Sequence, residues 1–231
     1  MTMKRFLLLI PLFLLGGCLA EPSKTLQPVG TYLVPDISRD QYEAILEQMD
    51  MGRISSEEAD KYYASPIFRH FYSNACSWYC AGLINDISGS SSFPLTGVWQ
   101  HDFFYAPQEA HDFNHETAWV PAKSVGEYIT YTFPANCPKI NTIKILNGMV
   151  KSDDAWRYFA RVKRLKMYLN DKALAILELE DSRSLQWFDI GEVGAENATE
   201  WRLKFEILEV YSGKIDQPAI SELYFDGEHT H

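Results

Sequence analysis

A polar loop in the middle of the chain offers oxygen atoms at closely spaced positions. Asp112, Asn114 and Thr117 supply a carboxylate, an amide and a hydroxyl. Hard cations such as Ca²⁺ bind about six to eight oxygens of these kinds, together with backbone carbonyls. The loop is therefore a candidate structural calcium site. The alternative is an Asx-type turn, in which the same side chains hydrogen-bond their own backbone.

Two histidines lie beside this loop. His111 and His115 are four residues apart, a spacing that binds zinc when both side chains lie on one face of a helix. Phe113 and Asn114 between them favour a loop over a helix. We therefore do not expect a zinc site.

Pairs of carboxylates are the only other candidates for catalysis. Asp153-Asp154 and the pair Glu178 and Glu180 could be imagined as the two acids of a glycosidase. Such surface pairs are common in a chain with 31 acidic residues. The chain has no nucleophile elbow, phosphate loop or metalloprotease helix. Enzymatic activity is therefore not expected.

The segment from Asn147 to Tyr158 has the chemistry of a sugar site. It contains an amide, Lys151, two aspartates and Trp156. A sugar has a rim of hydroxyls and an apolar face, so its binder needs donors and acceptors beside an aromatic plane. Tyr105, from the loop before the calcium candidate, could lie at the same end of the fold. The alternative is that Trp156 is a buried anchor of the loop.

Strands must position these residues. Residues 128–133 and 142–145 alternate apolar and polar side chains, and Pro134 and Pro138 bracket the turn between them. Residues 201–207 give the cleanest alternation in the chain. Its phase slips at Ile207-Leu208, which predicts a β-bulge. Further strands are expected at 161–169, 174–179, 185–190 and 219–225.

These short strands, separated by turn signals, predict an all-β sandwich over residues 74–231. The side chains that we expect to point into its core are Trp119, Ile129, Ile145, Leu165 and Phe205.

The first 17 residues have the features of a cleaved lipoprotein signal peptide. Lys4-Arg5 is followed by an apolar run, residues 6–15, that is too short to span a bilayer. The sequence at residues 15–18 resembles the bacterial lipobox, which implies that Cys18 carries acyl chains and anchors the protein. The alternative is an ordinary signal peptide with a chance cysteine. The expected location is the bacterial cell envelope, at the outer membrane or cell surface.

Two segments separate the anchor from the sandwich. Residues 18–36 are rich in Pro, Thr and Gln and have no period, which predicts a tether. Residues 37–73 predict a short α-helical arm, because Ser38 opens a capping box and apolar residues follow at helical spacing. Ser55 to Glu58 opens a second short helix. The arm could dock a partner protein or pack against the sandwich.

Charge and cysteines restrict the partners and the redox chemistry. The chain has 21 basic and 31 acidic residues; removal of residues 1–17 takes away Lys4 and Arg5, leaving 19 against 31 and a net charge of about −12. Such a surface disfavours nucleic acid and anionic lipid heads. Export allows disulfides, and Cys76–Cys80 and Cys80–Cys137 are both possible pairings.

Several separated motifs occur in order along the second part of the chain, at residues 88–92, Tyr105, 110–112, 117–119, 126–129, 145–152, 161–165, 179–181 with Gln186, 205–207, 210–213 and 219–223. Together they resemble a discoidin-like, galactose-binding-type domain. More narrowly, they are similar to the glycan-binding domain at the front of secreted bacterial NAD-glycohydrolase toxins, which also occurs alone in exported lipoproteins. The resemblance covers about residues 76–227.

The resemblance implies a jelly-roll sandwich that binds carbohydrate. No counterpart of the toxins' catalytic domain is found, so we expect a non-catalytic protein. In relatives, the loop that matches Asp112, Asn114 and Thr117 often holds a structural Ca²⁺, completed by a glutamate that matches Glu222. Phe113 stands where those relatives have glycine, which removes backbone freedom.

The resemblance also implies a ligand set. Sugar-binding relatives use a basic residue, an asparagine and an aromatic platform in loops at one end of the sandwich. Lys151 matches the basic position, Tyr105 and Trp156 are the nearby aromatics, and Asn147 and Arg161 complete the candidate set. Arg161 could equally hold the loop together. A protein-docking envelope lipoprotein is the alternative function, and a glycosidase comes third.

Overall fold

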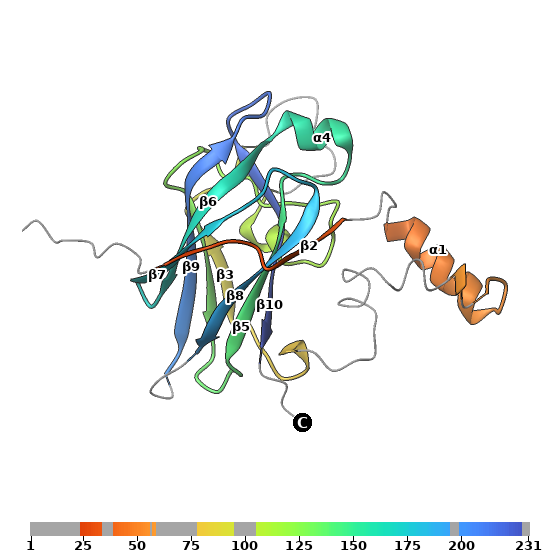
Figure 1. Ribbon diagram of the computed structural model, residues 1–231, viewed down its shortest axis with the longest axis horizontal. Coiled ribbons are helices and arrows are strands. Elements are labelled where there is room, and N and C mark those ends of the chain that lie inside the picture. The colour runs from red at the N-terminus through yellow and green to blue at the C-terminus, as the bar shows by residue number, and fades with distance from the viewer. Residues whose placement is uncertain are drawn as a thin grey trace, which may run out of the picture.

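Strands are the main secondary structure in the part of the chain that the structure describes. The computed structural model (Figure 1) describes residues 24–33, 39–55, 57–58, 78–94, 105–194 and 199–227. Its strands are β1 (Thr25–Leu26), β2 (Gly30–Leu33), β3 (Asp86–Gly89), β4 (Tyr128–Phe133), β5 (Ile140–Asn147), β6 (Ala160–Leu169), β7 (Lys172–Glu178), β8 (Ser184–Val193), β9 (Trp201–Tyr211) and β10 (Pro218–Gly227). Its helices are α1 (Arg39–Asp50), α4 (Asp153–Tyr158) and the short 3₁₀ turns η1 (Trp78–Cys80) and η2 (Pro107–Ala110).

The strands pair in the order β2-β8-β5-β10-β6-β9-β4-β3, with β1 and β7 beside that path. They form the predicted β-sandwich, and the strands expected between residues 128 and 225 are all present. The predicted bulge is also confirmed. The pairing of β6 with β9 shifts around Arg164, where Leu208 has no partner in the register.

The five side chains predicted to point inward are confirmed as core residues. Trp119, Ile129, Ile145, Leu165 and Phe205 each have 0% of their surface exposed. They belong to one cluster that the two layers enclose. The period-2 pattern predicts them because alternate residues of a strand face the same side.

Strand β10 joins the two layers. Its first residues pair in parallel with β6, at Pro218 and Ala219, and its later residues pair antiparallel with β5. Ile220 also forms bridges with Trp119 and Gly148. Loops therefore cover β10 on both sides, and all of its residues except Asp226 are buried.

The predicted tether differs from the structure over residues 25–33. Strand β1 pairs in parallel with β7, and β2 pairs antiparallel with β8. The Ile176 amide donates to Lys24 O, and the Val29 amide donates to Trp187 O, at 3.0 and 2.8 Å. A polar segment without a hydrophobic period can still become a strand here, because β7 and β8 offer it unpaired backbone groups.

The helical arm is described in part. Helix α1 has the predicted position, and Figure 1 shows it to one side of the sandwich. Residues 57–58 are helical, and the Glu58 amide donates to Ser55 Oγ at 3.2 Å, as expected of a helix start. Within the described ranges, no helix is both long and apolar enough to cross a membrane. The signal peptide and Cys18 lie outside the described residues.

Cys137 is a buried free thiol, so the Cys80–Cys137 pairing does not form. Its sulfur lies 3.6 Å from Leu83 O, and burial raises the thiol pKa. Cys76 lies outside the described residues, and its pairing with Cys80 stays a prediction.

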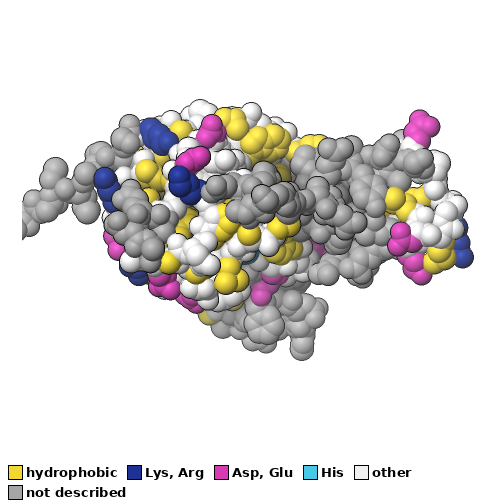
Figure 2. All heavy atoms as spheres, turned by 90° about the horizontal axis from the view of Figure 1, so that it is seen from below, with side chains coloured by type: hydrophobic (Ala, Val, Ile, Leu, Met, Phe, Trp, Pro, Cys, Tyr) yellow, Lys and Arg dark blue, Asp and Glu magenta, His cyan; other side chains and the backbone are white. Residues whose placement is uncertain are grey.

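Charged and apolar side chains are mixed on the surface. Figure 2 shows one face of the molecule, where acidic, basic and hydrophobic side chains lie between one another and no broad area of one kind is visible among the coloured atoms.

Candidate functional site

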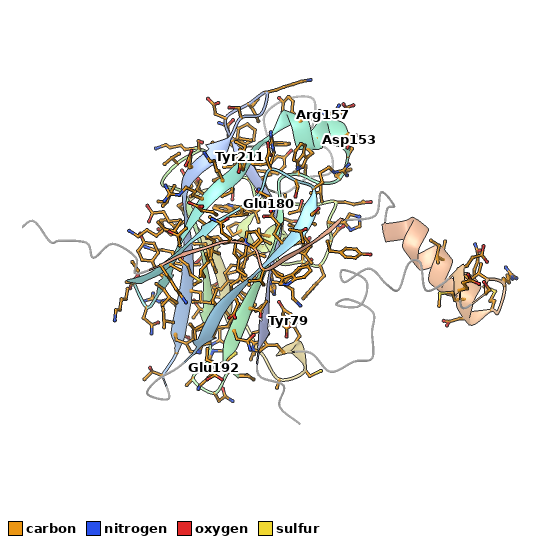
Figure 3. The ribbon with its side chains drawn as sticks, viewed as in Figure 1. Tyr79, Asp153, Arg157, Glu180, Glu192 and Tyr211 are labelled. Carbon is orange, nitrogen blue, oxygen red and sulfur yellow. The ribbon has the colours of Figure 1, made fainter. Side chains whose placement is uncertain are left out.

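Helix α4 forms one end of the sandwich, next to the candidate sugar residues. Ser152 caps it by accepting a hydrogen bond from the Ala155 amide at 3.1 Å. Asp153 pairs with Arg183 and, at 3.7 Å, with Arg157 on the next turn. Figure 3 shows Asp153 and Arg157 on α4, at the end opposite Tyr79 and Glu192. The cap and the ion pairs hold this short helix in place.

Asn147 fastens the base of the loop and does not face solvent. Its side chain is fully buried; Nδ2 donates to Val162 O at 2.7 Å, and Oδ1 accepts from the Val162 amide at 2.9 Å. The carboxamide thus completes the backbone pairing where β5 ends beside β6. With these bonds made, it has no exposed group to offer a ligand.

Arg161 is equally occupied. Its guanidinium binds Asp181 through Nε and Nη2, both at 2.9 Å, and Nη1 donates to Ser212 O at 2.6 Å. Only 7% of the residue is exposed. Of the two roles that the sequence left open, the structure shows the loop-holding one. Asp181 is the partner that sequence reasoning did not single out, although it lies in a motif of the resemblance.

Trp156 lies over this guanidinium. The Arg161 Cζ is 4.4 Å from the centre of the indole ring, and the ring packs on the cluster around Val150. Gly148 makes this packing possible. It has a φ of +83°, and a Cβ there would come within 2.8 Å of both Trp156 and Arg161. Trp156 is therefore half-buried, as its anchor role requires, and presents only part of its ring.

Of the remaining candidates, Lys151 is exposed and Tyr105 is not. Tyr105 has 9% exposure and packs edge-on against Phe93 and Phe159, so its ring is not available as a platform. Tyr158, which is 37% exposed on α4, is the solvent-facing aromatic residue of this end. The exposed chemistry around α4 thus includes Lys151, Asp154, Tyr158 and part of Trp156, beside the exposed ion pair of Asp153 and Arg157.

The second candidate, the Asp112 loop, folds against strand β10. Asp112 Oδ1 accepts from the Asn114 amide at 2.9 Å, and Asn114 Oδ1 accepts from the Glu116 amide at 3.2 Å. Thr117 Oγ1 lies 2.7 Å from Asp112 Oδ2. These are the Asx-type bonds of the alternative interpretation, and they also gather three oxygen-bearing side chains.

Glu222 brings a fourth oxygen-bearing side chain to this place. It is fully buried in β10, and neither carboxylate oxygen has a hydrogen-bond partner within the described chain. Burial, and then the Asp112 carboxylate, raise the pKa of Glu222 well above its usual value; the nearby Tyr224 hydroxyl and the amides of Phe113 and Asn114 act against this rise. A fully buried carboxylate is costly unless a cation or a proton neutralises it.

Glu109 is a residue of this cluster that sequence reasoning missed. Burial, followed by its contact with Asp112, raises its pKa to about 7. Glu109 belongs to η2, three residues before Asp112. It lies outside the loop motif Asp112, Asn114 and Thr117, so that motif did not indicate it. No three His, Cys, Asp or Glu side chains in the described ranges meet closely enough to form a metal site by themselves. The amide, hydroxyl and backbone oxygens are therefore essential to the calcium interpretation.

Phe113 keeps the backbone shape that glycine would give. Its φ is +62°, in the left-handed region that disfavours a bulky residue. Its ring stacks on Tyr224 at 5.3 Å with an interplanar angle of 7°. The stacking offsets the backbone strain of about 1–2 kcal/mol. The loop therefore keeps its conformation with phenylalanine in the position where relatives have glycine.

His111 fixes the loop to β10. Its Nδ1 lies 2.7 Å from Leu223 O, and its ring packs among aromatic side chains such as Tyr131. Burial lowers its pKa to about 4. A neutral imidazole in this position is structural.

The sequence of the sandwich matches a known protein family. The model of the family described as "NAD glycohydrolase translocation F5/8 type C domain" matches residues 78–226. The chain belongs to this family. The match spans the sandwich from η1 to β10, including both the α4 end and the Asp112 loop. A comparison with curated proteins found no match.

Two of the solved structures similar to this F5/8 type C domain contain domains named CBM32. One holds the CBM32-1 and CBM32-2 domains of Clostridium perfringens ZmpB in complex with GalNAc; it is 12% identical, with a TM-score of 0.50, over 90% of this chain and 41% of that one. Another is CpGH89CBM32-5 from the same organism, in complex with GalNAc-β-1,3-galactose, with 17% identity, a TM-score of 0.41, and coverage of 62% and 94%. The chain spans less than half of the ZmpB structure. At this identity the likeness shows the fold.

Proposed function

We propose that this F5/8 type C protein is a non-catalytic, lipid-anchored glycan-binding protein of the cell envelope. The observation that carries the proposal is the family match over residues 78–226, on a sandwich that shares its fold with the ZmpB modules solved with GalNAc. The anchor rests on the lipobox-like sequence that ends at Cys18.

The proposed glycan site is the exposed side of α4 and the loop before it. Lys151 supplies a charged donor, Asp154 an acceptor, and the accessible part of Trp156 an apolar surface. Asn147 and Arg161 hold these residues in position from below. This arrangement supports a shallow site for the end of a sugar chain, since such ligands need few contacts beside one aromatic plane.

The proposal includes a structural Ca²⁺ at the Asp112 loop. The fit rests on the buried carboxylate of Glu222, whose oxygens have no hydrogen-bond partner among the described residues. Asp112, Asn114, Thr117 and Glu222 would hold the ion. When bound, Ca²⁺ would neutralise the carboxylates and fasten the loop to the last strand.

The test of glycan binding is calorimetric titration with ligands selected on a glycan array. We expect Lys151→Ala to weaken binding about tenfold or more, because it removes a charged hydrogen bond. The melting temperature should stay that of the wild type, since Lys151 is exposed.

Lys172→Ala is the matched control, because Lys172 is also exposed but lies on β7, far along the chain and fold from α4. Unchanged affinity in Lys151→Ala would move the site away from α4. If the wild type binds no glycan on the array, the protein-docking function becomes the better explanation.

A further inference from the structure

A polar groove lies on the outer face of the sheet formed by β3, β4 and β9. Its volume is about 390 Å³, within the range of about 300–1,000 Å³ that is usual for small-ligand sites. The pairing register places its lining side chains on one face, opposite the core residues of the same strands. The residues that matter most are Ser88, Tyr128, Thr130, Thr132, Arg202 and Lys204.

Aromatic rings and ammonium groups alternate across this face. Lys204 Nζ lies 5.4 Å from the centre of the Tyr128 ring on β4 and 4.1 Å from the Tyr168 ring on β6. Lys166 Nζ on β6 also lies near the Tyr168 ring, 5.3 Å from its centre. Tyr128 is 39% exposed, so its ring is open to solvent. The row thus offers an aromatic plane beside two positive charges.

The salt bridges formed among the described residues do not include these two lysines. Some other strand lysines do have a carboxylate within reach, as Lys163 has Glu209 and Lys144 has Asp226. Within the described residues, no carboxylate forms a salt bridge with Lys166 or Lys204. Glu206 is opposite Lys166 in the register, but its carboxylate accepts the Tyr168 hydroxyl.

The groove also has acceptors and hydroxyls. Asp86 and Asp171 lie at its rim, and Asp171 is 3.6 Å from Arg202. The hydroxyls of Thr130 and Thr132 project from β4 between the charged groups. A ligand that fits this set has an apolar ring face, several hydroxyls and one negative charge.

We propose that this groove is a second ligand site and that it binds a carboxylated sugar, such as a uronic acid residue. The sugar ring lies on Tyr128, its carboxylate meets Lys204 and Arg202, and its hydroxyls meet the threonines and Asp86. The charge of the ligand is complementary to that of the lysines. This site adds to the proposed function and does not depend on the α4 loop.

The test is calorimetric titration of the full-length protein with a trimer of galacturonic acid and with its methyl ester. We expect the acid to bind and the ester to bind about tenfold more weakly or worse, because esterification removes the charge. Lys204→Ala should cause a similar loss. Raising the salt from about 0.05 to about 0.5 M should weaken binding of the acid, as screening increases.

Two control variants make the result specific. Lys214→Ala removes an exposed lysine outside the groove and should leave affinity for the acid unchanged. Tyr128→Phe should keep binding, whereas Tyr128→Ala should lose it, with thermal melts showing that both fold. Equal affinity of wild type and Lys204→Ala, equal affinity for acid and ester, or no binding by the wild type would each overturn the proposal. Lys151→Ala measured with neutral glycans tests the α4 site separately.

Discussion

At the scale of single residues, the most informative side chain is Glu222. A glutamate with no exposed surface and no hydrogen-bond partner in the described chain is expensive in any protein interior. Asp112 lies close enough to raise its pKa further. The cluster is therefore stable in one of two states, with a proton on Glu222 or with a cation beside it.

This gives a prediction about pH. The pKa of Glu222 is raised well above its usual value, and that of Glu109 to about 7. A carboxyl group whose pKa is higher in the folded than in the unfolded protein stabilises the fold at low pH. This stabilisation is complete below the pKa of the unfolded state, about 4.5, and it is lost as pH rises through the pKa of the folded state. The lowered pKa of His111, about 4, has the opposite effect, but only as pH falls below about 6.5. Of these three groups, only the two carboxyls change stability between about pH 6.5 and 8.

We therefore expect the melting temperature in a chelator to fall as pH rises from about 6.5 to 8. Added Ca²⁺ should raise the melting temperature again. At a hundredfold excess over the dissociation constant, the bound ion adds about 2.7 kcal/mol to the free energy of unfolding. Glu222→Gln, measured by the same thermal melts, should show a shallower pH dependence and a smaller response to Ca²⁺. A wild type that responds to neither chelator nor Ca²⁺ would mean that the loop is held by its Asx-type bonds alone.

At the scale of elements, the strands determine which parts of the loops can reach a ligand. Asn147 ends β5 and Arg161 is the second residue of β6, and both side chains are buried where the two strands meet through β10. The same crossing brings Glu222 under the Asp112 loop. Residues that look like ligand contacts in a loop motif thus become its supports.

The core of these elements gives the second prediction. Trp119 lies under β10, has 0% exposure, and donates from Nε1 to Ser91 O at 2.9 Å. Trp119→Ala should destabilise the protein by about 3–5 kcal/mol, because it leaves a large cavity. Denaturant unfolding measures this loss. Wild-type stability of the variant would contradict the packing described here.

At the scale of the whole molecule, the N-terminal segment connects the sandwich to its proposed anchor. Strands β1 and β2 cover the open edges at β7 and β8, so the chain is fastened to both layers soon after Lys24. A lipid on Cys18 would be attached only six residues before that point. The domain would therefore be held near the membrane surface.

The anchor itself gives the third prediction. Cys18→Ala should be exported but not lipidated, because the thiol that carries the acyl chains is absent. Cell fractionation should then find it in the soluble fraction, while the wild type stays with membranes after a high-salt wash. A variant that remains with washed membranes would show that something other than lipid holds the protein there.

The amino-acid sequence by itself determined the class of fold, the inward-facing residues and the position of the bulge. These depend on alternation along single strands, which is a local property that β4 displays throughout and β9 displays up to its bulge. The motifs also placed the chain in the discoidin-like group before any contact was known.

Only the tertiary structure decided which polar residues are accessible. Asn147 and Arg161 have the residue types of ligand contacts, yet pairing between β5, β6 and β10 buries them. Residues 25–33 became strands because distant edges satisfied their backbone groups, and Glu109 joined the Asp112 cluster through packing around η2. The row of Tyr128, Lys204 and Tyr168 comes from three strands that adjoin only in the folded sheet. The buried side chains, the added strands and this row depend on contacts between segments far apart in sequence, which no local pattern contains.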